Sequence, residues 1–312
     1  MLYVTTREKY DAYTTARTLQ SDAAIDGGLY FPYKMPQFSQ EEMTSFRDKS
    51  FGQNVADVLN LFFGTRLSGW DVEFSVGRYP VKLYSLHQKI LIAECWRNLE
   101  GSYKGMERQL AARVQGCFPS EVKLTSWLRI AIRIAVLAGV FSELQRQGMD
   151  SMVDISVEEG DFNQVMALWY ARQMGMPVGN IVFGCADGSS CWELIHNGAV
   201  RVSGQTSLEL ERLIRGTLGV DEALRFADCC QRGESYAVPA PLALQLRNGM
   251  SAAVVSPSRA RDVIPNVFNT AGYQMDETMA IAYSALLDFR AKTGGSRTAL
   301  ILGHKEPGRR EN

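Results

Sequence analysis

The hydrophobic positions in the first part of the chain repeat with the period of an α-helix. Apolar residues at helical spacing predict a helix over about 52–63. Ser39, with Glu42 three residues later, has the pattern of a capping box and predicts a helix start at that point. A short strand is expected at 2–5 and a further helix from about 102 to 114. The N-terminal region is therefore predicted to be mostly helical.

The rest of the chain begins with its longest apolar segment, 124–147, which is apolar nearly all round and predicts a central helix. Beyond it, strand patterns alternate with helix patterns. Strands are expected over 89–94, 152–157, 180–185, 251–255 and 297–302, and helices over 163–174, 189–196, 258–270 and 276–294. Such alternation indicates parallel strands joined by right-handed crossovers, hence an α/β fold with a parallel-sheet core and flanking helices.

Charge and hydropathy exclude two classes of partner. The 312 residues contain 33 Lys and Arg against 34 Asp and Glu, so no global positive field attracts nucleic acid. The longest apolar run, 134–141, is far shorter than the roughly 20 residues of a membrane span. The first residues also lack the apolar core of a signal peptide. We therefore expect neither a nucleic-acid nor a membrane partner.

The six cysteines and three histidines are scattered. Without a C-x-x-C spacing, they indicate neither a zinc site nor a disulfide framework, so no metal is expected. Buried, reduced thiols are the ordinary interpretation, and a reducing cytoplasm fits it.

The stretch 153–186 reads as strand, tight turn, helix and strand, an arrangement that often holds a phosphate at the helix N-terminus. This turn, however, carries Glu158, Glu159 and Asp161 and has neither Lys nor Arg. A helix N-terminus stabilises an anion by about 0.3–1 kcal/mol, whereas a carboxylate ~4 Å away opposes it by about 4 kcal/mol. Repulsion therefore dominates. The alternative is that Asp161 or a neighbour caps the helix 163–174.

A family resemblance begins at residues 22–43, "DAAIDGGLYFPYKMPQFSQEEM". This segment resembles threonine synthases, where an acidic-Gly-Gly-Leu-Tyr/Phe-x-Pro run precedes a helix. The matching residues are Asp26, Gly27, Gly28, Leu29, Tyr30 and Pro32. The resemblance implies a fold type II, tryptophan synthase β-like architecture and pyridoxal phosphate as the family's cofactor.

Further motifs of that family follow in order. "ECWRNLEGSYKG" is similar to E-L-F-H-G-P-T-L-A-F-K-D and places Lys104 on the Schiff-base lysine. The phosphate-holding turn G-N-F-G-N falls on Gly160, Asp161, Phe162, Asn163 and Gln164, and the Ser or Thr that contacts the pyridine nitrogen falls on Gly303 or His304. Retained scaffold positions are Gly28, Arg129, Gly160, Phe162, Gly175, Pro177, Glu211, Arg212, Gly272, Tyr273 and Asp276.

The departures from the family concern its chemistry. Ser126 follows Lys104 by only 22 residues, an interval that in the family holds a whole lobe with an S-G-D-T-G-type loop. We therefore expect a helical domain over 1–85 and a remnant of the large α/β domain over 86–312, with the small lobe missing between about 106 and 122. The acidic turn leads us to expect that pyridoxal phosphate is not retained.

Two interpretations of Lys104 stay open: a solvated helix lysine, or a Schiff-base lysine. The first accompanies a degenerate threonine synthase-like protein without that catalysis, acting as a binding module or partner subunit. The second implies a carbon–oxygen lyase that converts O-phosphohomoserine to threonine and phosphate, with substrate held by Arg97, Arg129 or Arg133.

Self-association or a partner protein over the missing-lobe surface is a third possibility. Trp96, Tyr103, Phe118 and Trp127 are the candidates for that surface, and ordinary core is the alternative for all four.

Overall fold

The computed structural model describes residues 1–8, 10–87, 89–160, 162–201 and 209–308. Its helices are α1 (Thr15–Thr18), α2 (Gln40–Ser45), a 3-10 helix (Phe46–Asp48), α3 (Phe51–Phe63), α4 (Gly69–Val76), α5 (Tyr103–Gln115), α6 (Ser126–Arg146), α7 (Asn163–Gln173), α8 (Ser190–Asn197), α9 (Glu209–Leu218), α10 (Val220–Arg232), α11 (Ala240–Gly249), α12 (Pro257–Ala271) and α13 (Glu277–Thr293). Its strands are β1 (Tyr3–Thr5), β2 (Tyr30–Pro32), β3 (Lys82–His87), β4 (Ile90–Glu94), β5 (Val153–Glu158), β6 (Val178–Cys185), β7 (Ala199–Arg201), β8 (Ser235–Ala237), β9 (Met250–Val254) and β10 (Ala299–Gly303).

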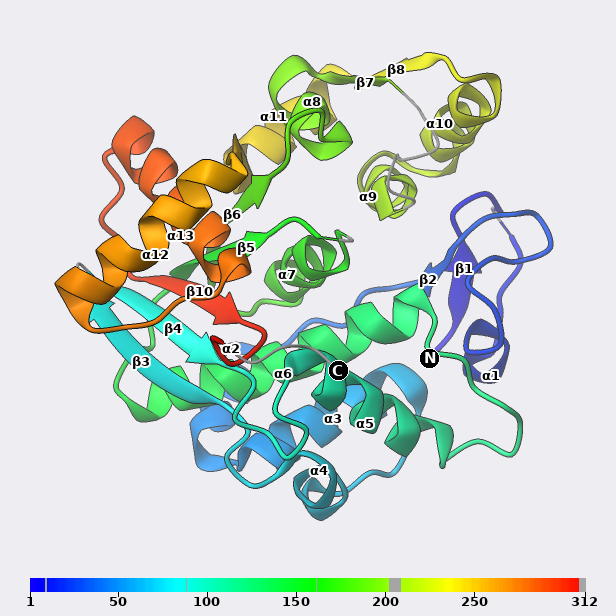
Figure 1. The fold of residues 1–312 in the computed structure, drawn as a ribbon. Helices are drawn as coiled ribbons and strands as arrows, with labels where there is room; N and C mark the ends of the chain where they lie inside the picture. Colours follow the sequence, from blue (N-terminus) through cyan, green and yellow to red (C-terminus); the bar gives the residue numbers. More distant parts are fainter. Residues whose placement is uncertain (9, 88, 161, 202–208, 309–312) are drawn as a thin grey trace.

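A six-stranded sheet with the order β3-β4-β10-β5-β6-β9 forms the centre of the molecule (Figure 1). Strands β4, β10, β5, β6 and β9 are parallel, and β3 is an antiparallel edge strand. The α/β fold with a parallel-sheet core is therefore confirmed. The helices predicted around it are confirmed as well, including the capping box of Ser39 and Glu42 at α2. The predicted domain boundary after residue 85 falls within β3.

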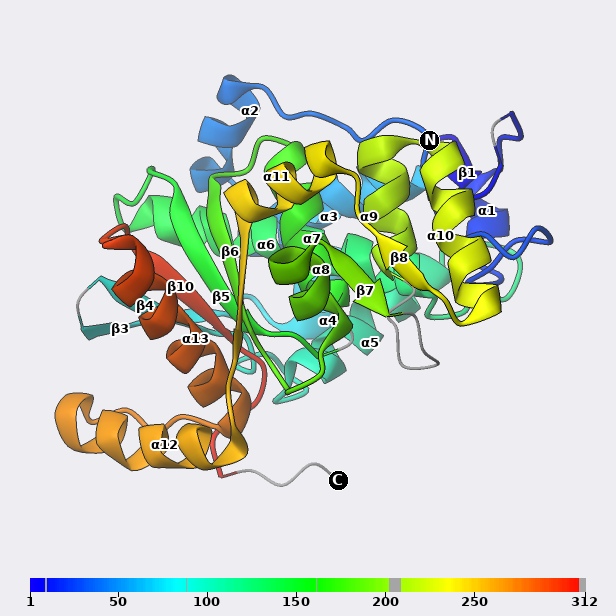
Figure 2. The ribbon, with the colours of Figure 1, turned by 90° about the horizontal axis from the view of Figure 1, so that it is seen from above.

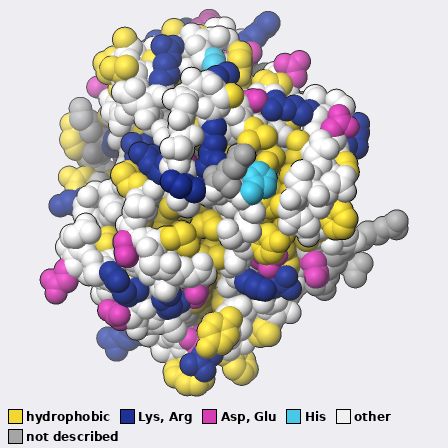
Figure 3. Space-filling view, turned by 90° about the vertical axis from the view of Figure 1, so that its left-hand side faces the viewer, with side chains coloured by type: hydrophobic (Ala, Val, Ile, Leu, Met, Phe, Trp, Pro, Cys, Tyr) yellow, Lys and Arg dark blue, Asp and Glu magenta, His cyan; other side chains and the backbone are white. Residues whose placement is uncertain are grey.

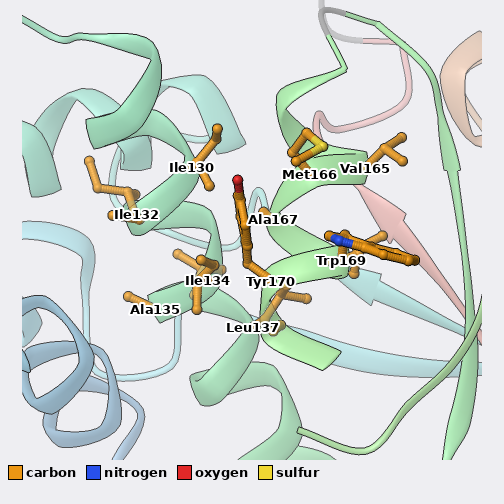
Figure 4. Close-up of a cluster of buried hydrophobic side chains, with 14 of the residues drawn as sticks. Ile130, Ile132, Ile134, Ala135, Leu137, Val165, Met166, Ala167, Trp169 and Tyr170 are labelled. Atoms are coloured by element: carbon orange, nitrogen blue, oxygen red, sulfur yellow. The ribbon is translucent and has the colours of Figure 1, made fainter. Parts of the chain in front are cut away.

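Helices cover both faces of the sheet (Figure 2). One hydrophobic core lies between the sheet and α3, α6 and α7, and a second lies between the other face and α12 and α13. Helix α6 is buried along nearly its whole length, as its all-round apolar pattern predicts. Figure 4 shows Tyr170 of α7 pointing toward α6, whereas Trp169 projects from another side of α7.

Helices α3 and α6 approach each other closely at Gly139. A Cβ atom at this position would collide with the ring of Phe51. Overpacking of this kind costs about 1–3 kcal/mol, which exceeds the gain of up to about 1 kcal/mol that alanine brings to a helix over glycine.

We therefore expect Gly139→Ala to lower the free energy of unfolding by about 1 kcal/mol, measured by urea denaturation. Gly216→Ala in α9 is the matched control, because nothing lies within 4 Å of its Cβ position, and it is expected to stabilise the protein. A stabilising Gly139→Ala would show that Phe51 moves aside freely.

The side of the molecule that carries α12 has hydrophobic side chains gathered around a central hollow (Figure 3). On this side, His87, Val267, Tyr283 and neighbouring residues line a pocket of about 470 Å³. The Tyr283 hydroxyl lies 3.2 Å from Nε2 of His87.

The free cysteines are only partly as expected. Cys95, Cys185 and Cys191 are buried, and burial raises the pKa of Cys95 to about 12, which makes its thiol unreactive. Cys117 is exposed, because it lies in the loop after α5, so the prediction of burial is wrong there. Cys229 and Cys230 on α10 are partly exposed.

Within the described residues, none of the helices has both the length and the apolar composition that a bilayer crossing requires.

Candidate functional site

The carboxyl ends of three adjacent parallel strands bring the predicted site positions to one edge of the sheet. Strand β10 lies between β4 and β5, with Gly303 paired to Glu94 at the end of β4. Lys104 lies on the helix that follows β4, His304 comes directly after β10, and the acidic turn begins where β5 ends at Glu158. In open α/β sheets, ligands bind at this edge.

Lys104, Arg129 and His304 line one pocket of about 260 Å³, so the structure brings these three predicted residues together. Ser102 caps α5 by accepting a hydrogen bond from the Gly105 amide at 3.0 Å, which places Lys104 in the first turn of the helix. The Tyr103 amide donates to the His304 carbonyl at 2.7 Å, and the two rings lie 4.7 Å apart. Lys104 itself is exposed.

The pocket is positively charged. Arg133 and Lys305 line it together with Lys104 and Arg129, and the carboxylate among its lining residues is Glu107. Glu107 is 2% exposed and accepts from Arg129 at 3.0 Å and from Arg133 at 2.7 Å. Four cations around one carboxylate favour an anionic ligand.

Glu107, Thr278 and Lys305 were not predicted from the sequence. A signal for Glu107 does exist. Arg129 and Arg133 are four residues apart on an otherwise apolar helix and therefore share a face. Two cations on a mostly buried face require a carboxylate from a neighbouring helix.

The turn after β5 follows the strand next to β10, but none of its described residues lines this pocket. Phe162 has a left-handed backbone (φ +62°), and its buried ring packs against Phe183. Asn163 and Gln164 are buried at the start of α7, and Gly160 also has positive φ.

Glu158 and Glu159 line a different pocket of about 560 Å³, together with Asp187 and Glu277. This side of the turn is therefore acidic, as the sequence predicts. The N-cap of α7 is Phe162, which makes no side-chain capping bond. Asp161, the residue named as the predicted cap, lies outside the described residues, so capping of α7 by an acidic residue stays a prediction.

Gly303 is packed against Trp96. A Cβ atom at Gly303 would collide with the Trp96 ring and lie 3.1 Å from the sulfur of Met279. A serine or threonine therefore does not fit at Gly303, which is one of the two positions that the resemblance assigns to the pyridine-nitrogen contact. The other position, His304, lines the Lys104 pocket. Neither position carries the family's Ser or Thr hydroxyl, and the turn after β5 has neither Lys nor Arg, so the described residues fit pyridoxal phosphate poorly.

Arg97 does not line the Lys104 pocket. It donates to Glu94 at 2.8 Å, and Glu94 also accepts from the Tyr273 hydroxyl at 3.0 Å. The hydrogen bond that Arg97 donates to Glu94 raises the pKa of Arg97. Burial, reinforced by Glu94, raises the pKa of Tyr273. Arg97 is thus paired with Glu94 outside the pocket, whereas Arg129 and Arg133 are paired with Glu107 inside it. A role in substrate binding stays a prediction for all three arginines.

The aromatic residues near the predicted deletion are mostly core. Trp96, Tyr103 and Trp127 are at most 4% exposed. Trp96 belongs to the core on the α12 and α13 side, whereas Phe118 is partly buried against the core that contains Tyr103 and Trp127. Between α5 and α6, residues 116–125 form a loop without helix or strand. Among the described residues, no group of histidine, cysteine or acidic side chains is arranged to hold a metal ion.

Comparisons with known proteins define first the class of the fold. The described chain has the α/β architecture of fold type II enzymes. It is similar over 98% of its length to threonine synthases: that of Brucella melitensis with pyridoxal phosphate bound (TM-score 0.80, 18% identity, 89% of that chain), that of yeast (0.81, 14%, 87%) and that of Escherichia coli (0.71, 14%, 89%).

The particular resemblance is carried by the N-terminal region. Residues 2–76 match the family described as "Threonine synthase N terminus". No curated protein sequence matches the chain. The predicted resemblance to threonine synthases is therefore confirmed, both in the fold and in the N-terminal segment.

Proposed function

We propose that this threonine synthase-like protein binds a small anionic ligand in the Lys104 pocket and does not carry out the threonine synthase reaction. The observation that carries this proposal is the packing of Trp96 against Gly303, because it leaves no room for a side chain at one of the two positions that the resemblance assigns to the pyridine-nitrogen contact. The other position, His304, carries an imidazole in place of the family's hydroxyl. The carboxylates Glu158 and Glu159 support it, since they repel a phosphate at the neighbouring turn. The pocket itself keeps four cations for an anion.

The short loop 116–125 supports the loss of the family's small lobe, and a partner protein or a second copy over that region remains part of the proposal. Free cysteines fit a cytoplasmic location.

A pyridoxal phosphate-dependent carbon–oxygen lyase is the second candidate. It is favoured by one observation: Lys104 and His304, the positions of the family's Schiff-base lysine and of its ring contact, line the same pocket. Lys104 is nevertheless exposed, and Glu107 already engages the two nearby arginines, which leaves little to activate an amine.

The two candidates are separated by titrating the pure protein with pyridoxal phosphate and assaying O-phosphohomoserine. We expect no visible absorption band of a lysine-bound cofactor, no borohydride-trapped label on Lys104 and no phosphate release. Lys104→Ala, run in parallel, should behave like the unaltered protein. A trapped adduct that disappears in Lys104→Ala, with phosphate release, would establish the lyase instead.

A further inference from the structure

A second pocket lies at the opposite edge of the sheet, between α7 and α11. It has a volume of about 510 Å³, within the range of small-molecule sites. Helix α7 runs from the carboxyl end of β5 to the amino end of β6, and α11 leads directly into the amino end of β9. The pocket is lined by the end of α7 and by α11, so it is separate from the Lys104 pocket.

The floor and rim of this pocket are apolar. Trp169, which projects from α7 on a different side from Tyr170 (Figure 4), is 5% exposed and lines the pocket. Pro241 and Leu244 line it from α11, and Leu244 is 62% exposed. A large aromatic floor beside an exposed leucine suits a planar apolar body.

Arg172 gives the pocket its charge. It lies three residues after Trp169 and therefore on the same side of α7. Its guanidinium donates to the Gly249 carbonyl at 3.5 Å, and among the described residues it forms no ion pair. The remaining lining side chains, Gln173, Gln245 and Asn248, are amides without charge.

The position of the Arg172 guanidinium depends on the absence of a side chain at Gly249. A Cβ atom there would lie 2.5 Å from Nη1 of Arg172 and 3.3 Å from the Trp169 ring. The glycine thus leaves room for the guanidinium beside the indole. A guanidinium in this setting binds a carboxylate with two parallel hydrogen bonds.

We propose that the α7–α11 pocket binds a small aromatic monocarboxylate, with its carboxylate on Arg172 and its ring on Trp169. One cation with uncharged amides around it matches a single negative charge rather than a phosphate dianion. The proposal is independent of the function assigned to the Lys104 pocket.

The test uses phenylacetate, benzoate and cinnamate as probes in calorimetric titrations, with phenylacetamide as the uncharged analogue. We expect saturable binding of at least one carboxylate, weakened about tenfold or more in Arg172→Gln and for the amide. Gly249→Ala, which displaces the guanidinium without removing its charge, should weaken binding as well. Thermal unfolding of each variant verifies that it is folded.

Two control variants locate the site. Arg247→Gln removes a cation on α11 that donates to the Ile195 carbonyl at 3.2 Å and does not line the pocket, so binding should persist. Lys104→Gln should also leave binding unchanged. Equal binding by Arg172→Gln, loss of binding in Lys104→Gln, or failure of every carboxylate to bind would each overturn the proposal.

Discussion

Replacing Glu107 with glutamine is expected to lower the free energy of unfolding by about 3 kcal/mol. The carboxylate is 2% exposed and neutralises Arg129 and Arg133, whose side chains are 32% and 11% exposed. Removing the carboxylate takes the ion-pair partner from Arg129 and one partner from Arg133. Breaking a fully buried ion pair in this way costs about 3–5 kcal/mol. The partial exposure of Arg129 places the expected loss at the lower end.

The same substitution is expected to make the protein respond more strongly to anions. With Glu107 uncharged, the arginines attract an external anion, which stabilises the folded state in proportion to its occupancy. Phosphate should therefore raise the unfolding temperature of Glu107→Gln more than that of the unaltered protein.

Glu100→Gln provides the control for Glu107. Glu100 is exposed and accepts from Gln109 at 2.9 Å, so its replacement should change stability by less than about 0.5 kcal/mol. Urea denaturation with and without phosphate measures both effects. A loss below about 1 kcal/mol for Glu107→Gln would mean that water compensates the arginines.

The second large effect is expected for Arg212→Met. Arg212 is fully buried, is ion-paired with Glu209, and donates to the Tyr30 carbonyl and to the Ser126 hydroxyl, each at 2.9 Å. Methionine keeps the volume but leaves the Glu209 carboxylate and the Tyr30 carbonyl without this donor. We expect a loss of about 3–5 kcal/mol.

The loss should be accompanied by faster proteolysis near Tyr30, because Arg212 links α9 to the segment that carries β2. Arg225→Met is the matched control: its pair with Glu222 has the same i, i+3 spacing, but the side chains are 46% and 29% exposed. Such a pair contributes less than about 1 kcal/mol. If the two substitutions lowered the free energy of unfolding equally in urea denaturation, burial of the Arg212 pair would not be the reason for its large contribution.

The structure explains why Glu211 and Arg212 match the threonine synthase pattern: both side chains make contacts that hold the N-terminal region. Glu211 accepts from Nε and Nη2 of Arg7, each at 2.9 Å, while Arg212 holds Tyr30. Together they connect α9 to the N-terminal strands. The sequence resemblance identified these positions but not what they contact.

The central sheet and the grouping of Lys104 with His304 could be predicted, because apolar runs mark the strands and the resemblance gives the order of the motifs. Edge strand β3 could not be predicted, since its residues are partly exposed and combine polar with apolar side chains. The contact between Trp96 and Gly303 could not be predicted from the sequence either, because the two positions are 207 residues apart and only the folded sheet brings them together.

Helices α9, α10 and α11 were also not predicted. Each has a buried side, but the first two carry charges in most turns, and α11 begins with proline at its first turn. Glu107 was overlooked for a related reason: a charged residue on the amphipathic helix α5 has the pattern of a solvated side chain, and only the neighbouring helix α6 supplies its partners.

The position of β10 determines the order in which this protein can assemble during synthesis. Strand β10 is the last of the described strands in the chain, yet it lies in the interior of the sheet, between β4 and β5. Until the ribosome has made it, the pair β3-β4 and the group β5-β6-β9 each expose an unpaired inner edge, and such edges invite aggregation. The central sheet can therefore be completed only after nearly the whole chain has been made, because β10 must enter between two groups of strands that precede it in the sequence.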